Sequence, residues 1–167
     1  MVRRMLVLML AAVAITAFYG VDVSIADEKG GEKVGIKLEA APDVKTEAKA
    51  KASFVLDKAS GSLKYKLEVE NLQDVTMGHI HAVGDSGLPG PVLAWLYPVG
   101  GSAASLKEGK FTGTLAEAAL TADQLAGPMK GKTPKEVYEM LEYGKAGVAL
   151  HTKQNPKGEL WGVAKKK

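Results

Sequence analysis

The chain has 167 residues, with 22 Lys and Arg against 19 Asp and Glu, and it contains no cysteine. The missing cysteines exclude disulfide bonds, thiolate catalysis and zinc–thiolate sites. The formal net charge is only +3, and the lysines are scattered apart from a short run at the C-terminus. We therefore expect no nucleic-acid partner, because nucleic-acid-binding proteins concentrate basic side chains on one face.

Residues 1–26 have the features of a secretory signal peptide. Arg3 and Arg4 precede an apolar segment that runs to Val21, and small residues follow at the positions that signal peptidase reads, up to Ala26. We expect cleavage after Ala26, which places the protein in the periplasm or outside the cell without a membrane attachment. The alternative is a retained signal anchor, because the apolar segment is close to the shortest length that spans a bilayer.

The rest of the chain is expected to form one domain. Residues 27–35 are mainly polar and contain several glycines, which predicts a flexible lead-in. Residues 36–164 are assigned to a single folded domain, which is long enough to bury a core of its own.

Alternating apolar and polar side chains mark the first part of this domain. Residues 48–57 and residues 63–70 both alternate with period two, and the turn residues 58–61 join them. This pattern predicts a hairpin of two half-buried strands. Further strands are predicted at residues 34–40, 76–83, 91–97, 110–115, 146–151 and 159–164.

The middle of the domain changes to a helical pattern. Thr121 with Gln124, and Thr133 with Glu136, have the spacing of capping boxes. The first pair predicts a short helical turn that ends near residues 127–128. The second predicts a helix that runs to Tyr143 and buries Val137, Met140 and Leu141. Many short strands with one short helical insertion predict an all-β, antiparallel fold, a sandwich or a barrel.

The chain has three histidines, and they lie in two of the predicted strands. His79 and His81 flank Ile80, and His151 follows an apolar run. Alternate side chains of a strand share a face, so His79 and His81 point the same way. Two imidazoles at this spacing can bind one metal ion, and His151 can complete the set if its strand lies beside the first.

The two histidine segments resemble the two signatures of the CHRD family, which is named after chordin. The first signature corresponds to His79-Ile80-His81, a glycine-rich loop and Gly90-Pro91-Val92-Leu93. The second corresponds to His151-Thr152 followed by Asn155-Pro156-Lys157-Gly158-Glu159-Leu160. The resemblance extends over residues 37–164. It implies an immunoglobulin-like or superoxide-dismutase-like β-sandwich in an extracytoplasmic protein, and it implies no defined reaction.

The chain departs from the family pattern at two positions. Val83 stands where the family usually has a glycine, so that the loop after His81 is about one residue longer. Trp161 stands where the family usually has an arginine. Any role of that arginine is absent or reassigned here.

We consider two interpretations of the histidines. In the first, His79, His81 and His151 bind one ion, and Met77 on the same strand face is a further candidate ligand. Imidazole with thioether sulfur suits copper or zinc better than magnesium or calcium. In the second, the imidazoles only hydrogen-bond neighbouring loops. Two acidic residues that follow the histidine segments, Asp85 and Glu159, are candidate ligands or orienting partners.

No catalytic residue is assigned from the sequence. Three histidines are too few for a dinuclear dismutase site, and no Gly-x-Ser-x-Gly motif is present. We expect a binding or structural protein, with a mononuclear copper redox protein of the periplasm as the alternative. Its partner would be an unidentified extracytoplasmic protein or small ligand. Trp161 is the better candidate for an exposed contact, because Trp95 lies in an apolar strand and is expected in the core.

Overall fold

The computed structural model describes residues 31–101 and 103–165. The predicted signal peptide and residues 27–30 of the predicted lead-in lie outside this part of the chain. Within it, no helix combines the length and the apolar character needed to cross a membrane. The first strand begins at Glu32, so residues 32–35 belong to the folded domain and the prediction of a flexible lead-in is wrong for them.

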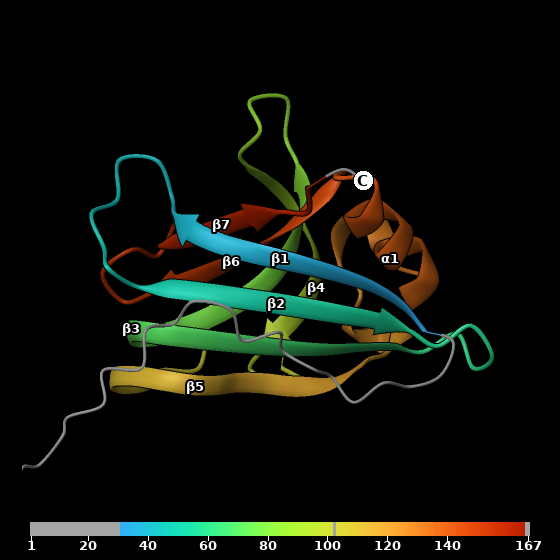
Figure 1. Cartoon of the computed structure of the whole chain (residues 1–167), viewed down its shortest axis with the longest axis horizontal. Coiled ribbons are helices and arrows are strands. Elements are labelled where there is room, and N and C mark those ends of the chain that lie inside the picture. The colour runs from blue at the N-terminus through green and yellow to red at the C-terminus, as the bar shows by residue number, and fades with distance from the viewer. Residues whose placement is uncertain (1–30, 102, 166–167) are drawn as a thin grey trace, which may run out of the picture.

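In the described part of the chain, seven antiparallel strands and one short α-helix make up the fold. Figure 1 shows their arrangement. The prediction of an all-β, antiparallel fold with one short helical insertion is confirmed. The strands are β1 (Glu32–Ala40), β2 (Lys49–Leu56), β3 (Leu63–Val83), β4 (Pro89–Tyr97), β5 (Lys107–Leu120), β6 (Ala146–Thr152) and β7 (Leu160–Val163), and the helix is α1 (Pro134–Glu142).

The strand pairings close the sandwich into a barrel. β1 pairs with β2, β2 with β3, β3 with β6, β6 with β7, and β7 again with β1. β5 and β4 add to β3 outside this ring. The ring closes through two residue pairs between β1 and β7, Glu39 with Trp161 and Ala40 with Leu160.

β3 is the central strand, and it joins two predicted strands into one. The sequence suggested separate strands at residues 63–70 and 76–83, but the hydrogen-bonded strand runs without interruption through both. Its first half pairs with β2 and β5, and its second half with β6 and β4. Asn71 and Asp74 have positive φ angles of 56° and 52° where the register shifts, so bulges bend the strand from one side of the barrel to the other.

The core fills the barrel, and α1 covers one end of it (Figure 1). The side chains of Leu63, Tyr65 and Leu67 alternate inward as the period-two pattern predicted. The capping box predicted at Thr133 and Glu136 is present at the start of α1. Helix residues Val137, Tyr138 and Leu141 are buried, whereas Met140, predicted to be buried, is half-buried.

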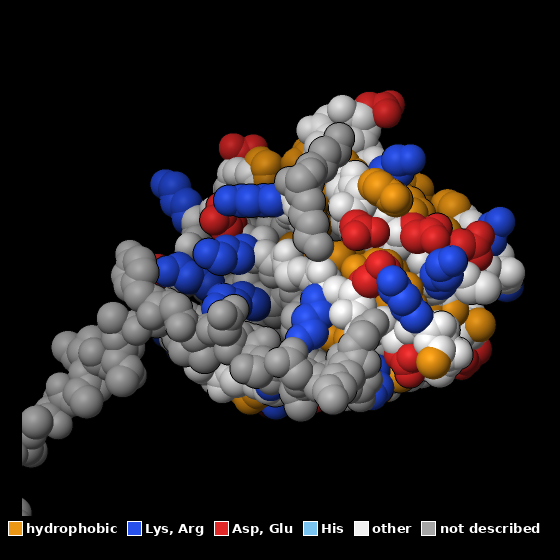
Figure 2. All heavy atoms as spheres, turned by 45° about the vertical axis from the view of Figure 1, so that its right-hand side comes forward, with side chains coloured by type: hydrophobic (Ala, Val, Ile, Leu, Met, Phe, Trp, Pro, Cys, Tyr) orange, Lys and Arg blue, Asp and Glu red, His pale blue; other side chains and the backbone are white. Residues whose placement is uncertain are grey.

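Charged side chains of both signs share the face that carries α1. Lys132 and Lys135 form ion pairs with Glu136 and Glu139, one helical turn further along the chain. Figure 2 shows acidic and basic side chains side by side over this face. Exposed pairs of this kind contribute little to stability.

Replacing Gly162 with alanine should destabilise the barrel where β7 meets β1. A Cβ atom there would overlap the carbonyl oxygen of Lys37 and lie 2.9 Å from Ile36 Cγ2. We expect the free energy of unfolding, measured by urea denaturation, to fall by about 1–3 kcal/mol. Gly35→Ala is the matched control, because a Cβ atom at Gly35 meets nothing within 4 Å. Equal stability of the two variants would contradict the prediction.

Candidate metal site

The three histidines lie on the outer face of the barrel wall, where β3 and β6 run side by side. Ile80 is fully buried in the core, so its neighbours His79 and His81 point to the opposite face. On β6, the core residue Leu150 precedes His151, which therefore also points outward. The pairing of β3 with β6, which the sequence left open, brings the two signatures together.

The histidines are nevertheless buried, because two tryptophans and small residues enclose them. His79, His81 and His151 have exposed fractions of 4%, 7% and 5%. Trp95 of β4 packs edge-on against His79, with ring centroids 4.2 Å apart, and Trp161 of β7 lies 6.3 Å from His81. The histidines and tryptophans thus form a small buried cluster on the outside of the barrel, separate from the core inside it.

Small residues on β6 make room for this cluster. Gly147 pairs with His81, and Ala149 pairs with both His79 and Trp161. A Cβ atom at Gly147 would lie 2.6 Å from Cη2 of Trp161. Glycine at this position therefore lets the Trp161 ring lie flat over β6 beside the imidazoles.

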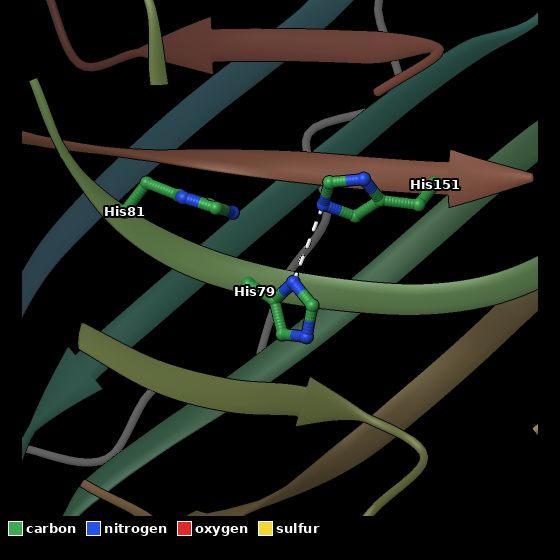
Figure 3. Close-up of side chains that lie close together, drawn as sticks. All are labelled: His79, His81 and His151. Carbon is green, nitrogen blue, oxygen red and sulfur yellow. Dashed lines mark hydrogen bonds between the residues drawn. The ribbon is translucent and has the colours of Figure 1, made fainter. Parts of the chain in front are cut away.

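The imidazoles are close enough to bind one ion together. One nitrogen from each ring can be chosen so that all three lie within 4.8 Å of one another. Nδ1 of His79 lies 3.2 Å from Nε2 of His151, the contact that is dashed in Figure 3. Two nitrogens bound to one tetrahedral ion at ~2.0–2.1 Å lie roughly 3.3 Å apart. A distance of more than about 6–7 Å from His151 to both other imidazoles would exclude a shared ion, and the contact of His151 with His79 is much shorter.

Backbone carbonyls determine which nitrogens are free to bind. Nδ1 of His81 donates to the carbonyl oxygen of Gly90 at 2.8 Å, and Nδ1 of His151 donates to that of Pro156 at 3.0 Å. Because a carbonyl only accepts, both rings carry their proton on Nδ1 and leave Nε2 with a lone pair. Carbonyl partners of this kind orient metal-binding histidines in known sites.

Burial keeps the three histidines neutral. It lowers the pKa of His79 to about 3, and the neighbouring His151 and His81 add to this effect. It also lowers the pKa of His81 and of His151, although the hydrogen bonds to Gly90 and Pro156 act in the opposite direction. Neutral imidazole is the form that binds metals.

The acidic candidates from the sequence do not join the cluster. Among the described histidines and acidic residues, only His79, His81 and His151 come together as a possible metal-binding group. Asp85 is exposed in the loop between β3 and β4. Asp85 and Glu159 therefore lie outside this group of candidate ligands.

Glu159 instead holds two loops together. It is buried and accepts hydrogen bonds from the hydroxyls of Thr46 and Thr152, each at 2.7 Å, and from the side-chain amide of Asn155 at 3.0 Å. Asn155 precedes Pro156, the acceptor for His151. Glu159 therefore supports the loop that orients this histidine without contacting it.

Met77 pairs directly with His151 across β3 and β6. By strand alternation its side chain shares the outer face with His79 and His81, and it is half-buried. Its assignment as a ligand stays a prediction.

Trp95 differs from expectation, whereas the contact role suggested for Trp161 stays a prediction. Trp95 was expected in the core, but it is half-buried and packs against His79. Trp161 is also half-buried, and its indole N–H donates to the carbonyl oxygen of Gly87 at 3.1 Å. Trp161 and Pro156 also line an open groove of about 530 Å³. The role of Trp95 was missed because cross-strand register brings it to His79, and a sequence pattern does not show register.

Comparison with known proteins identifies the family. The CHRD domain model matches residues 29–163, which is most of the chain and includes both histidine segments. No curated protein and no solved structure matches. The chain belongs to the CHRD domain family.

Proposed function

We propose that this protein binds one copper or zinc ion through His79, His81 and His151, as an exported binding protein without a reaction of its own. The observation that carries the proposal is the convergence of three buried imidazoles, with one nitrogen of each ring within 4.8 Å of the other two. Nε2 of His81 is buried without a hydrogen-bond partner among the described residues. Residues 1–26, with their signal-peptide features, support export.

A purely structural role accounts poorly for the three buried imidazoles. An unsatisfied buried polar group costs about 1–3 kcal/mol, and apolar side chains of the same size would avoid this cost. The structural role explains the Nδ1 atoms of His81 and His151, which hold neighbouring loops. It does not explain why one nitrogen of each of three neutral rings lies within 4.8 Å of the other two. A bound ion would be shared by these three nitrogens.

The arrangement supports binding rather than turnover. Three neutral nitrogen donors leave a position for a fourth ligand, as in mononuclear sites. No described carboxyl group is part of the cluster that could act there as a general base. These donors support metal binding, and we assign no reaction to them.

Metal content of the purified protein tests the proposal. After incubation with zinc or copper and removal of the excess, we expect close to one ion per chain by mass spectrometry of the elements. The variant with His79→Ala and His81→Ala should retain almost none. A second double variant, His79→Gln with His81→Gln, keeps polar side chains of similar size and should also lose the metal.

Asp85→Ala is the matched control. Asp85 is an exposed acidic residue close to the histidines in sequence, and we expect this variant to bind metal as the unmodified protein does. Equal metal content in the unmodified protein and in both histidine variants, each folded by circular dichroism, would refute the proposed function.

A further inference from the structure

We infer that the site selects monovalent copper, and that the thioether sulfur of Met77 supplies an additional donor. This inference rests on the proposed function and specifies the ion. Three features of the described residues carry it: the charge of the donor set, the burial of the site and the position of Met77.

The donor set is electrically neutral. The three imidazoles are uncharged, and the orienting partners of His81 and His151 are backbone carbonyls rather than carboxylates. Glu159 is engaged by two hydroxyls and an amide, and Asp85 is exposed. A bound ion would therefore keep its full charge inside the site. The cost of burying charge grows with its square, so a divalent ion would pay about four times the cost of a monovalent one.

Burial leaves little space for the water molecules that divalent ions retain. The imidazoles are at most 7% exposed, and Trp95 packs edge-on against His79 at a centroid distance of 4.2 Å. Trp161, held by its hydrogen bond to Gly87, stands near His81 on the other side. Cupric ions prefer tetragonal coordination with several ligands. Cuprous ions accept few ligands, so an enclosed site with three nitrogens favours them.

Met77 adds a soft donor on the same face. It pairs in register with His151 and precedes His79 by two residues, so its side chain stands beside both histidines on the outer face. Thioether sulfur favours cuprous copper over harder divalent ions. Methionine also fills gaps in cores, but Met77 lies on the outer face of β3 and is not a member of the core inside the barrel.

Selectivity for Cu(I) is tested by comparing the affinities of the site for the two oxidation states of copper. Nitrogen sites in general bind Cu(II) more tightly than Zn(II), so that order decides nothing here. The informative quantity is the affinity for Cu(I) relative to Cu(II), which the reduction potential of the bound copper reports. We expect this potential to be more positive than that of copper in water. We also expect Cu(I), measured anaerobically by competition with a cuprous chelator, to bind more tightly than Zn(II).

Met77→Leu tests the role of the sulfur, because leucine keeps the apolar volume and removes the donor. We expect the affinity for Cu(I) to fall about tenfold relative to Cu(II), which lowers the potential by roughly 59 mV. The affinity for Zn(II) should not change. Met140→Leu is the matched control, a half-buried methionine on α1, and should leave all three values unchanged.

Two results would overturn the inference and leave the proposed function intact. One is a protein that binds Zn(II) at least as tightly as Cu(I), with a potential no higher than that of aqueous copper. The other is a folded Met77→Leu variant whose ratio of Cu(I) to Cu(II) affinity equals that of the unmodified protein. Failure of the unmodified protein to bind zinc or copper in any oxidation state would instead refute the proposed function itself.

Discussion

Replacing Glu159 with alanine should lower the free energy of unfolding by about 3–5 kcal/mol. The substitution removes the acceptor for Thr46, Thr152 and Asn155 at once, and Thr152 is fully buried. The Thr152 hydroxyl would then lose the acceptor for its proton, while it would still accept a hydrogen bond from the backbone N–H of Asn155. Chemical denaturation of the unmodified protein and the variant measures the difference.

Two further variants sharpen this prediction. Glu159→Gln keeps one acceptor oxygen for Thr152 and Asn155, and its amide can donate to the Thr46 hydroxyl, so we expect a much smaller loss. Glu139→Ala removes an exposed glutamate that is paired with Lys135, and should change stability by less than about 0.5 kcal/mol. A loss below about 1 kcal/mol for Glu159→Ala would show that these hydrogen bonds do not hold the two loops.

Glu159→Ala should also weaken metal binding indirectly. Glu159 fixes Asn155, the neighbour of Pro156, whose carbonyl oxygen orients His151. A displaced carbonyl would leave the His151 ring less well positioned, and loss of such a partner typically costs 10–100-fold in affinity.

Acidification of the metal-free protein should destabilise it steeply between pH 7 and pH 5. Burial lowers the pKa of His79 in the folded state to about 3, whereas the unfolded chain has the ordinary value of 6.5. Above pH 6.5 both states are neutral at this residue, so it adds no pH dependence there. As the pH falls below 6.5, only the unfolded state takes up the proton, and the folded state loses stability until the pH reaches about 3.

His79 alone should account for about 2 kcal/mol of lost stability between pH 7 and pH 5. His81 and His151 act in the same direction, because burial also lowers the pKa of each. Denaturation curves at both pH values, with a chelator present, measure the loss. His79→Gln does not titrate at this position, so its loss over the same range should be smaller by about that amount. An identical pH dependence in the two proteins would mean that His79 takes up its proton as readily in the folded state as in the unfolded state.

The sequence predicted the local structure well where one face of a strand is buried. The alternation in residues 48–57 and 63–70 matched β2 and the start of β3, because a half-buried strand imposes period two on its side chains. The capping box at Thr133 and Glu136 marked the start of α1, since it satisfies the free N–H groups of a first helical turn. Met140 packs only partly against the core, because Val137, Tyr138 and Leu141 form the helix face that is fully buried.

By itself, the sequence determined that His79 and His81 share a strand face, that the fold is all-β, and that cysteine chemistry is excluded. These conclusions depend only on residue types and short spacings. Only the tertiary structure decided the rest. The register of β3 with β6 brought Nε2 of His151 to 3.2 Å from Nδ1 of His79, and the register with β4 brought Trp95 against His79. The same register left Asp85 and Glu159 out of the cluster. Contacts between residues more than seventy positions apart, such as that of His79 with His151, arise from strand pairing, and no local pattern in the chain encodes that pairing.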